Sequence, residues 1–217
     1  AESFDVTSPT MVGGHGDLLF APEATAGNPV EDVSYLEADL GHLGASSTDA
    51  VLAYYSPSVN GFAFGASTQA IGTANDITSY GVSYTGDMGG ASFKIGADAA
   101  DGAANNTSNH MGISLNMGDL TMGVGSATVK TAADNEEDHV SYGITYNISD
   151  AVSLNAGHVD SQNTGQSKDM TTTSIGVSYT IATGLTAHIA NNMFDYKESN
   201  ATVNDGSIMS AVIKMSF

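Results

Sequence analysis

The chain has 217 residues, 24 acidic side chains and only five basic ones, all of them lysines, which gives a formal net charge of −19. This acidity excludes binding to a nucleic-acid backbone by charge neutralisation, and the lack of cysteine excludes disulfide frameworks, zinc–thiolate sites and cysteine nucleophiles. The length allows one domain or two small ones. No apolar run reaches the roughly 18 residues that a membrane-spanning helix needs.

Residues 1–49 are irregular and acidic. They carry nine carboxylates and no lysine. Such a concentration of negative charge repels itself unless it is solvated, protonated or matched by cations. The simplest interpretation is a solvated acidic surface loop, and the alternative is a segment that presents its carboxylates to a functional site.

From residue 50 onward the dominant period is two. In one stretch Met111, Ile113 and Leu115 alternate with Gly112 and Ser114, and the same alternation recurs to the end of the chain. Strict alternation predicts β-strands, whereas helical spacing is nowhere sustained. We predict eleven strands, at about 50–56, 61–69, 77–85, 91–98, 110–117, 120–130, 139–147, 151–159, 172–181, 185–194 and 207–217.

The connections between these strands alternate in length. Those predicted to be short are 57–60, 86–90, 118–119, 148–150 and 182–184. Those predicted to be long are about 70–76, 99–109, 131–138, 160–171 and 195–206, and most acidic residues after position 50 lie in or beside them. One end of the sheet should therefore be compact, and the other long and acidic.

The composition of the two faces favours a membrane barrel. The outward positions of a soluble sandwich are usually rich in Lys, Glu, Thr and Arg, whereas the polar face here is mostly Gly, Ser, Thr and Asn. This suits a sheet whose apolar face meets lipid, and such a sheet must close on itself. Aromatic residues at the short-turn end predict an interfacial girdle, although cross-strand packing in a soluble barrel is an alternative. They are Tyr55, Phe62, Tyr84, Tyr146, Tyr179 and Phe217.

With these features the sequence resembles the general porins of the Gram-negative outer membrane, most closely the alphaproteobacterial type. The stretch Val51–Ser67 looks like a recurrent porin hairpin, and the last strand ends in Phe217, as the assembly signal of the family does. Long and short connections alternate as in the family. Residues 1–49 look like its long third loop.

The resemblance implies an all-β, transmembrane, antiparallel up-and-down barrel. Residues 1–49 would be an inward-folded acidic pore loop and residues 50–217 the barrel strands, within one domain. A bacterial barrel with both ends in the periplasm needs an even number of strands. We therefore expect either one more strand within 1–49, or five strands before Ala1 that complete a sixteen-stranded barrel.

The implied function is passive diffusion of small hydrophilic solutes and ions through a water-filled channel in the outer membrane, with no catalysis and no required cofactor. The implied partners are outer-membrane lipids, lipopolysaccharide and two further copies in a homotrimer. Alternation places Lys94 and Lys214 on the lumen side. The acidic residues expected to narrow the pore are Asp17, Glu23, Glu31, Asp32, Glu37 and Asp39.

Two clusters of carboxylates are candidate Ca²⁺ ligands, Glu31 with Asp32 and Glu136 with Glu137 and Asp138. Neither has EF-hand spacing, and a hydrated loop tip is the alternative. Two rival functions remain at this point, a structural or adhesive surface protein that binds divalent cations and an outer-membrane hydrolase. The sequence contains no G-x-S-x-G elbow, P-loop or H-E-x-x-H motif.

Overall fold

The computed structural model describes residues 50–70, 77–102, 106–130, 136–165, 167–199 and 201–215. Every regular element within these ranges is a β-strand, and there are eleven. The same ranges contain no helix long and apolar enough to span a bilayer. The strands are β1 (Ala50–Tyr55), β2 (Phe62–Ala70), β3 (Ile77–Met88), β4 (Ala91–Asp101), β5 (Thr107–Met117), β6 (Leu120–Lys130), β7 (Glu136–Asn147), β8 (Val152–Asn163), β9 (Lys168–Ala182), β10 (Leu185–Glu198) and β11 (Ala201–Met215).

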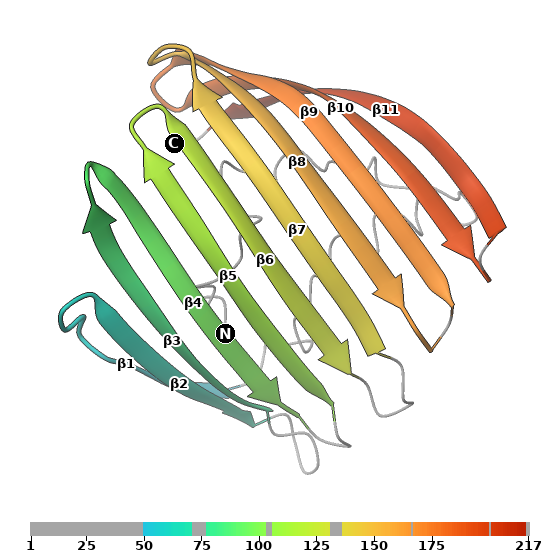
Figure 1. The fold of residues 1–217 in the computed structure, drawn as a ribbon. Helices are drawn as coiled ribbons and strands as arrows, with labels where there is room; N and C mark the ends of the chain where they lie inside the picture. Colours follow the sequence, from blue (N-terminus) through green and yellow to red (C-terminus); the bar gives the residue numbers. More distant parts are fainter. Residues whose placement is uncertain are drawn as a thin grey trace.

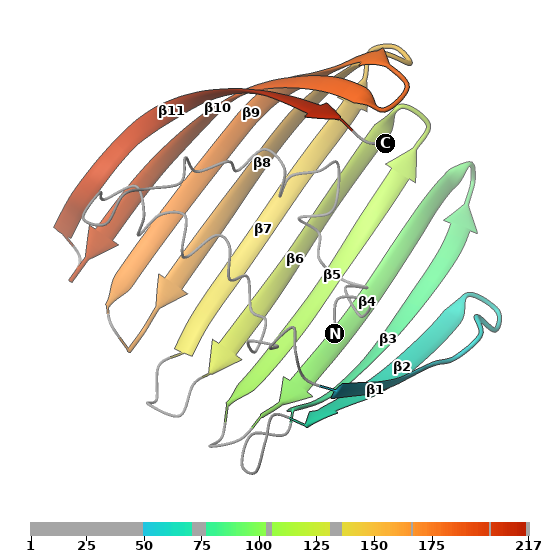
Figure 2. The same ribbon diagram turned by 180° about the vertical axis from the view of Figure 1, so that it is seen from behind.

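All eleven strands form one sheet in which the order in space is the order in the chain. Each strand is antiparallel to its neighbours, from β1–β2 through to β10–β11. The sheet is strongly curved, with a convex face toward the viewer in Figure 1 and a concave face toward the viewer in Figure 2. The predicted up-and-down architecture and the predicted eleven strands of residues 50–217 are confirmed.

Tight turns define one edge of the sheet. Gly118 and Asp119 alone connect β5 to β6, and Gly118 has a φ of 62°. Gly89 and Gly90 connect β3 to β4 with φ values of 60° and 90°. Two-residue turns with positive φ match the right-handed twist of the flanking strands, and glycine adopts this conformation without a steric penalty. The compact edge therefore lies where the sequence predicts short connections.

At the opposite edge the strands are longer than predicted. β8 continues to Asn163 and β9 begins at Lys168, although the sequence predicts a connection over 160–171. Likewise β10 ends at Glu198 and β11 begins at Ala201, although a connection is predicted over 195–206. These two predicted long connections are wrong. The apolar alternation fades there, but backbone pairing continues because the hydrogen bonds between strands do not depend on apolar side chains.

The register assigns every side chain to one of two faces. Residues opposite each other on neighbouring strands share a face, so Ile95, Ile113 and Val124 lie together on one side. Gly112 and Gly125 lie together on the other side. We call the first, which is convex, the outward face, and the second, which is concave, the inward face.

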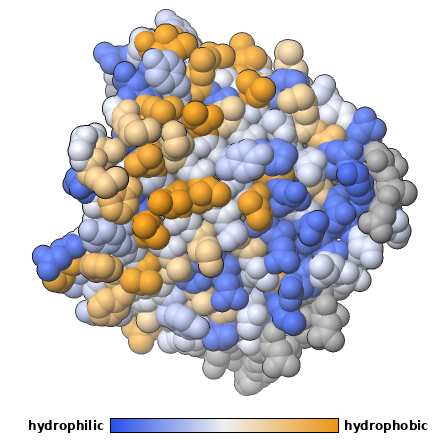
Figure 3. Space-filling model, in the orientation of Figure 1, coloured by the Kyte–Doolittle hydropathy of each residue, from blue (hydrophilic) through white to orange (hydrophobic). Residues whose placement is uncertain are grey.

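The outward face carries a broad band of exposed apolar side chains. Exposed fractions reach 75% for Leu52, 56% for Ile175 and 77% for Met209. In Figure 3 hydrophobic residues cover the part of this face toward the short turns, and hydrophilic residues cover the part toward the long connections. An apolar surface of this extent is unfavourable in water and indicates contact with another apolar phase.

The two faces exchange character near the long-connection end. On β10, Phe194 and Tyr196 lie on the inward face with Met170 of β9, while Asp195 and Lys197 lie on the outward face. Tyr196 is only 4% exposed, and Lys197 forms an ion pair with Asp195 at 3.3 Å. This inversion is expected where the outward face leaves an apolar phase and meets water, since apolar residues then turn inward as they do in soluble hairpins.

Aromatic residues gather on the outward face near the short turns. The rings of Phe62 and Tyr84 lie 4.5 Å apart, and Tyr84 and Phe93 lie 5.7 Å apart, measured between centroids. Tyr146 and Tyr179 are exposed at the same end. Tyr55 pairs with Gly65 on the inward face, so its predicted place in the girdle is wrong. The pairing of β1 with β2 puts Tyr54 on the outward face instead.

Substitution with lysine should distinguish the two faces of β6. Val124→Lys places a charge in the apolar band and should lower the free energy of unfolding in lipid vesicles by about 2–4 kcal/mol. Thr121→Lys places the same charge on the inward face and should cost less than about 1 kcal/mol. Guanidinium titration of the reconstituted protein measures both values, and equal costs would contradict the assignment of the faces.

The inward apolar cluster also has a measurable effect on stability. Tyr196→Ala should lower the free energy of unfolding by about 3 kcal/mol, because the ring it removes is buried. Tyr179→Ala removes a ring that is half exposed on the outward face and should cost about 1 kcal/mol. The same titration compares the two variants. A larger loss for Tyr179→Ala would show that the cluster contributes little.

Candidate pore wall

The inward face is lined by small and polar side chains, many of them buried. A soluble β-sandwich has an apolar core on its concave side. Here, by contrast, the largest group of buried side chains is polar. Its members on the inward face of the described strands are Ser67, Ser108, His139, Ser141, Asn155, Ser161, Asn163, Thr172, Ser174 and Asn192. Such a face suits an aqueous interior.

A chain of side-chain hydrogen bonds crosses four strands of this wall. The Thr145 hydroxyl donates to Asn155 Oδ1 at 3.0 Å, and Asn155 Nδ2 donates to Ser178 Oγ at 3.0 Å. Ser178 Oγ in turn lies 2.8 Å from His188 Nδ1. Because each residue belongs to a different strand from β7 to β10, these bonds fix polar groups at the surface of the wall and connect neighbouring strands.

Further pairs extend the polar wall toward the long connections. The Ser174 hydroxyl donates to Asn192 Oδ1 at 2.5 Å, and His139 Nδ1 lies 2.8 Å from Ser161 Oγ. The Glu137 carboxylate accepts from Asn163 Nδ2 at 2.6 Å. These neutral and anionic groups are held in place by their partners, as hydrogen-bonded polar groups at a wall should be.

One close acid–histidine pair lies on the inward face of β4 and β5. Asp98 Oδ1 and His110 Nδ1 are 2.6 Å apart, and the two side chains are 16% and 15% exposed. The residues are directly opposite each other in the register. The alternation of the sequence reveals that both face inward, but it does not reveal their pairing, which depends on the register.

Of the two lysines predicted to face the lumen, the structure describes the side chain of Lys94 and not that of Lys214. Lys94 of β4 pairs with Thr85 and Ser114 and therefore lies on the inward face, where it is exposed. Lys214 lies in β11 opposite Thr186, but its side chain is outside the described structure. Its orientation stays a prediction. Lys168, which the sequence analysis does not name, also lies on the inward face. It is the first residue of β9 and is opposite Glu198.

The predicted constriction lies outside the described residues. This applies to all six acidic residues named for it, and also to the assembly signal Phe217. The set is Asp17, Glu23, Glu31, Asp32, Glu37 and Asp39. Their role stays a prediction.

The second candidate Ca²⁺ cluster is divided between the two faces. Glu136 lies outward and forms an ion pair with Lys130 at 3.5 Å, and Asp138 lies outward and accepts from the Thr128 hydroxyl at 2.6 Å. Glu137 lies on the inward face with Asn163. The three carboxylates do not converge, and within the described ranges no group of three or more His, Asp or Glu could hold a metal ion. The other candidate pair, Glu31 and Asp32, is outside these ranges.

Solved structures of outer-membrane channels share this curved antiparallel sheet. OccAB2 of Acinetobacter baumannii superposes with a TM-score of 0.62 at 11% identity, over 76% of this chain and 53% of that one. OpdL of Pseudomonas aeruginosa gives 0.60 at 10% identity, over 75% and 58%. The anion-selective porin from Comamonas acidovorans gives 0.55 at 16% identity, over 76% and 55%. A search of curated proteins found no match.

The chain therefore spans somewhat more than half the length of these structures. At such low identities the superpositions establish the fold alone. The sequence itself establishes the family, because the family model described as Gram-negative porin matches residues 6–199. This match covers most of the chain and agrees with an outward face suited to lipid and an inward face suited to water. The protein is an outer-membrane β-barrel protein, and it belongs to the Gram-negative porin family.

Proposed function

We propose that the protein forms a water-filled channel for passive diffusion of small hydrophilic solutes and ions. One observation carries this proposal: a curved sheet exposes apolar side chains on its convex face and polar ones on its concave face. A hydrated interior inside an apolar exterior is what a transmembrane pore requires. Membership of the porin family supports the same conclusion and supports the absence of catalysis. Nothing in the described residues favours the adhesive or hydrolytic alternatives.

The proposal requires that the sheet be closed. Among the described strands β1 and β11 have one neighbour each. A bilayer core offers no hydrogen-bond partners to an open edge, so further strands must connect these two edges. The resemblance to general porins supports sixteen strands in all, and it supports a homotrimer in contact with lipopolysaccharide. The sixteen strands, the homotrimer, the contact with lipopolysaccharide and the alphaproteobacterial type are all part of the proposal.

We further propose that the channel favours cations. The described inward face presents Asp87, Asp98, Glu137 and Glu198 against two lysines, Lys94 and Lys168. Residues 1–49 contribute nine further carboxylates to the chain. Fixed charges of one sign raise the local concentration of counter-ions and lower the barrier to their passage.

Planar-bilayer recording tests the channel itself. The complete protein, added from detergent to a lipid bilayer in KCl, should produce stable stepwise increases of current, because each inserted barrel adds one water-filled path. A protein that inserts into vesicles but conducts no current would contradict the channel function. Hydrolysis of lipid or peptide substrates under the same conditions would favour the enzymatic alternative.

Two charge reversals test which face controls selectivity. Lys94→Glu adds negative charge to the inward face, so it should raise the K⁺/Cl⁻ permeability ratio by about 1.5-fold or more. Lys130→Glu changes the net charge equally but on the outward face, so the ratio should stay unchanged. The zero-current potential in a KCl gradient reports both. An equal shift in the two variants would show that total charge, not the charge of the lumen, determines selectivity.

A further inference from the structure

Two histidines lie in one row on the inward face, each near a carboxylate. The row crosses β3 to β8, and its members are directly opposite one another from strand to strand: Gly81, Asp98, His110, Ala127, His139 and Ser161. We call it the histidine row. Only the small side chain of Ala127 lies between the two histidines. Imidazoles titrate near neutral pH, so this row can change its charge where carboxylates and lysines do not.

Each histidine can take up a proton while it keeps its hydrogen bond within the sheet. His110 Nδ1 lies 2.6 Å from Asp98 Oδ1, so a neutral ring that donates from Nδ1 takes its second proton at Nε2. His139 Nδ1 lies 2.8 Å from Ser161 Oγ, and its Nε2 lies 4.0 Å from Glu137 Oε2. Protonation therefore adds positive charge near a carboxylate in both places, and the bonds between strands stay in place.

Few other ionisable side chains of the described strands β3–β8 face this row. The next inward row toward the short turns has none; it consists of Ser83, Gly96, Gly112, Gly125, Ser141 and Val159. The next row toward the long connections has only Glu137, beside Ser79, Ala100, Ser108, Val129 and Asn163. Lys94 is four residues from Asp98 along β4, which is about 13 Å in an extended strand. Lys168 on β9 is two strands away from Glu137.

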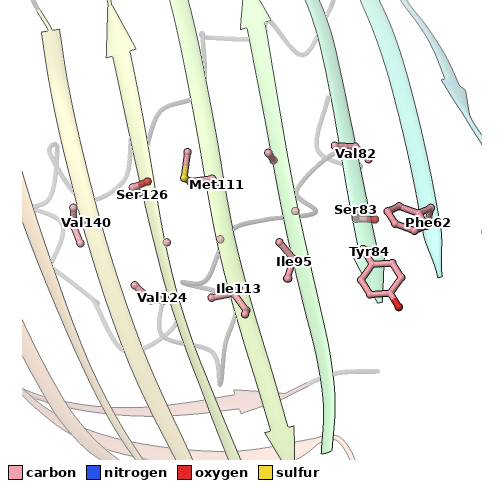
Figure 4. A pocket seen from close by; sticks show the side chains of 14 residues that line it. Phe62, Val82, Ser83, Tyr84, Ile95, Met111, Ile113, Val124, Ser126 and Val140 are labelled. Atoms are coloured by element: carbon pink, nitrogen blue, oxygen red, sulfur yellow. The ribbon is translucent and has the colours of Figure 1, made fainter. Parts of the chain in front are cut away.

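Behind the row, the outward side of the sheet is apolar or acidic. The outward residues Met111, Ser126 and Val140 each adjoin a member of the row in sequence, and they line an apolar hollow of about 690 Å³ (Figure 4). The lining of this hollow includes no charged residue. Two carboxylates that adjoin the row in sequence, Asp138 and Asp160, also point outward, away from the channel. Within the described strands β3–β8, acidification can therefore add positive charge at this level only through the two histidines.

We propose that His110 and His139 make the cation preference of the channel depend on pH, an inference that rests on the proposed channel function. On the described inward face four carboxylates stand against two lysines while the histidines are neutral. Protonation of His110 and His139 cancels this excess of negative charge, so K⁺ loses its electrostatic advantage over Cl⁻ on acidification. A third inward histidine, His188, whose Nδ1 lies 2.8 Å from Ser178 Oγ, acts in the same direction.

The zero-current potential of the complete protein in a KCl gradient tests this at pH 8 and pH 5. The K⁺/Cl⁻ permeability ratio of the wild type should fall about twofold or more, and the fall should lie in the titration range of histidine, above the range near about pH 4 in which carboxylates titrate. The double variant His110→Gln/His139→Gln keeps hydrogen-bonding groups but cannot take up the protons, so it should lose at least half of the response. The control His158→Gln removes a histidine from the outward face of β8 and should respond as the wild type does.

Two results would overturn the proposal. One is a double variant that responds to pH as strongly as the wild type, and the other is a wild-type ratio that stays constant between pH 8 and pH 5. The absence of current at both pH values would contradict the channel itself, and this inference with it.

A second measurement needs neither a variant nor a current. Hydrogen–deuterium exchange at the imidazole C2 position, read by mass spectrometry of the wild type in lipid vesicles, reports the protonation of His110. The exchange rate should titrate between pH 8 and pH 5. If His110 keeps one protonation state over this range, it cannot control selectivity and the proposal is wrong.

Discussion

The hydrocarbon core of a bilayer cannot hydrogen-bond with a peptide group, and this constraint determines the architecture of the protein. Every strand in the interior of the described sheet pairs with two neighbours, so its N–H and C=O groups are satisfied without water. Turns such as Gly118–Asp119 keep adjacent strands in register with almost no chain between them. The up-and-down order follows, because consecutive strands that pair directly leave no backbone groups to be satisfied elsewhere.

A second consequence is that each side chain is selected by the phase it meets. Within the apolar band, outward residues such as Val124 meet lipid and inward residues such as Ser141 meet the polar interior. Beyond the band the arrangement reverses, with Tyr196 inward and Asp195 outward. Part of the net charge of −19 can therefore be located in the structure. Acidic side chains of the described strands, including Asp138, Asp160 and Asp195, are outward at the end where the outer surface meets water.

Periodicity was informative where one face meets lipid along the whole strand. The eleven strands and their faces are read directly from alternation, as in residues 111–117, and the glycine turns mark their short ends. Alternation failed at 160–171 and 195–206, where the polarity of the faces changes and the pairing continues. The signal for this change is present in residues 194–197, where Phe194 and Tyr196 alternate with Asp195 and Lys197 in the opposite phase.

The sequence by itself therefore determined the class of fold, the polarity of its two faces and the inward position of Lys94, because a period of two and the solvent on each side are local properties. Tertiary structure decided which residues meet across strands. The 2.6 Å pair of Asp98 with His110 and the inward place of Tyr55 depend on register. Glu137 is separated from Glu136 and Asp138 because β7 already begins at Glu136, where the sequence predicts a connection. Register is set by the turns and by the pairing of the whole sheet, which no single strand encodes.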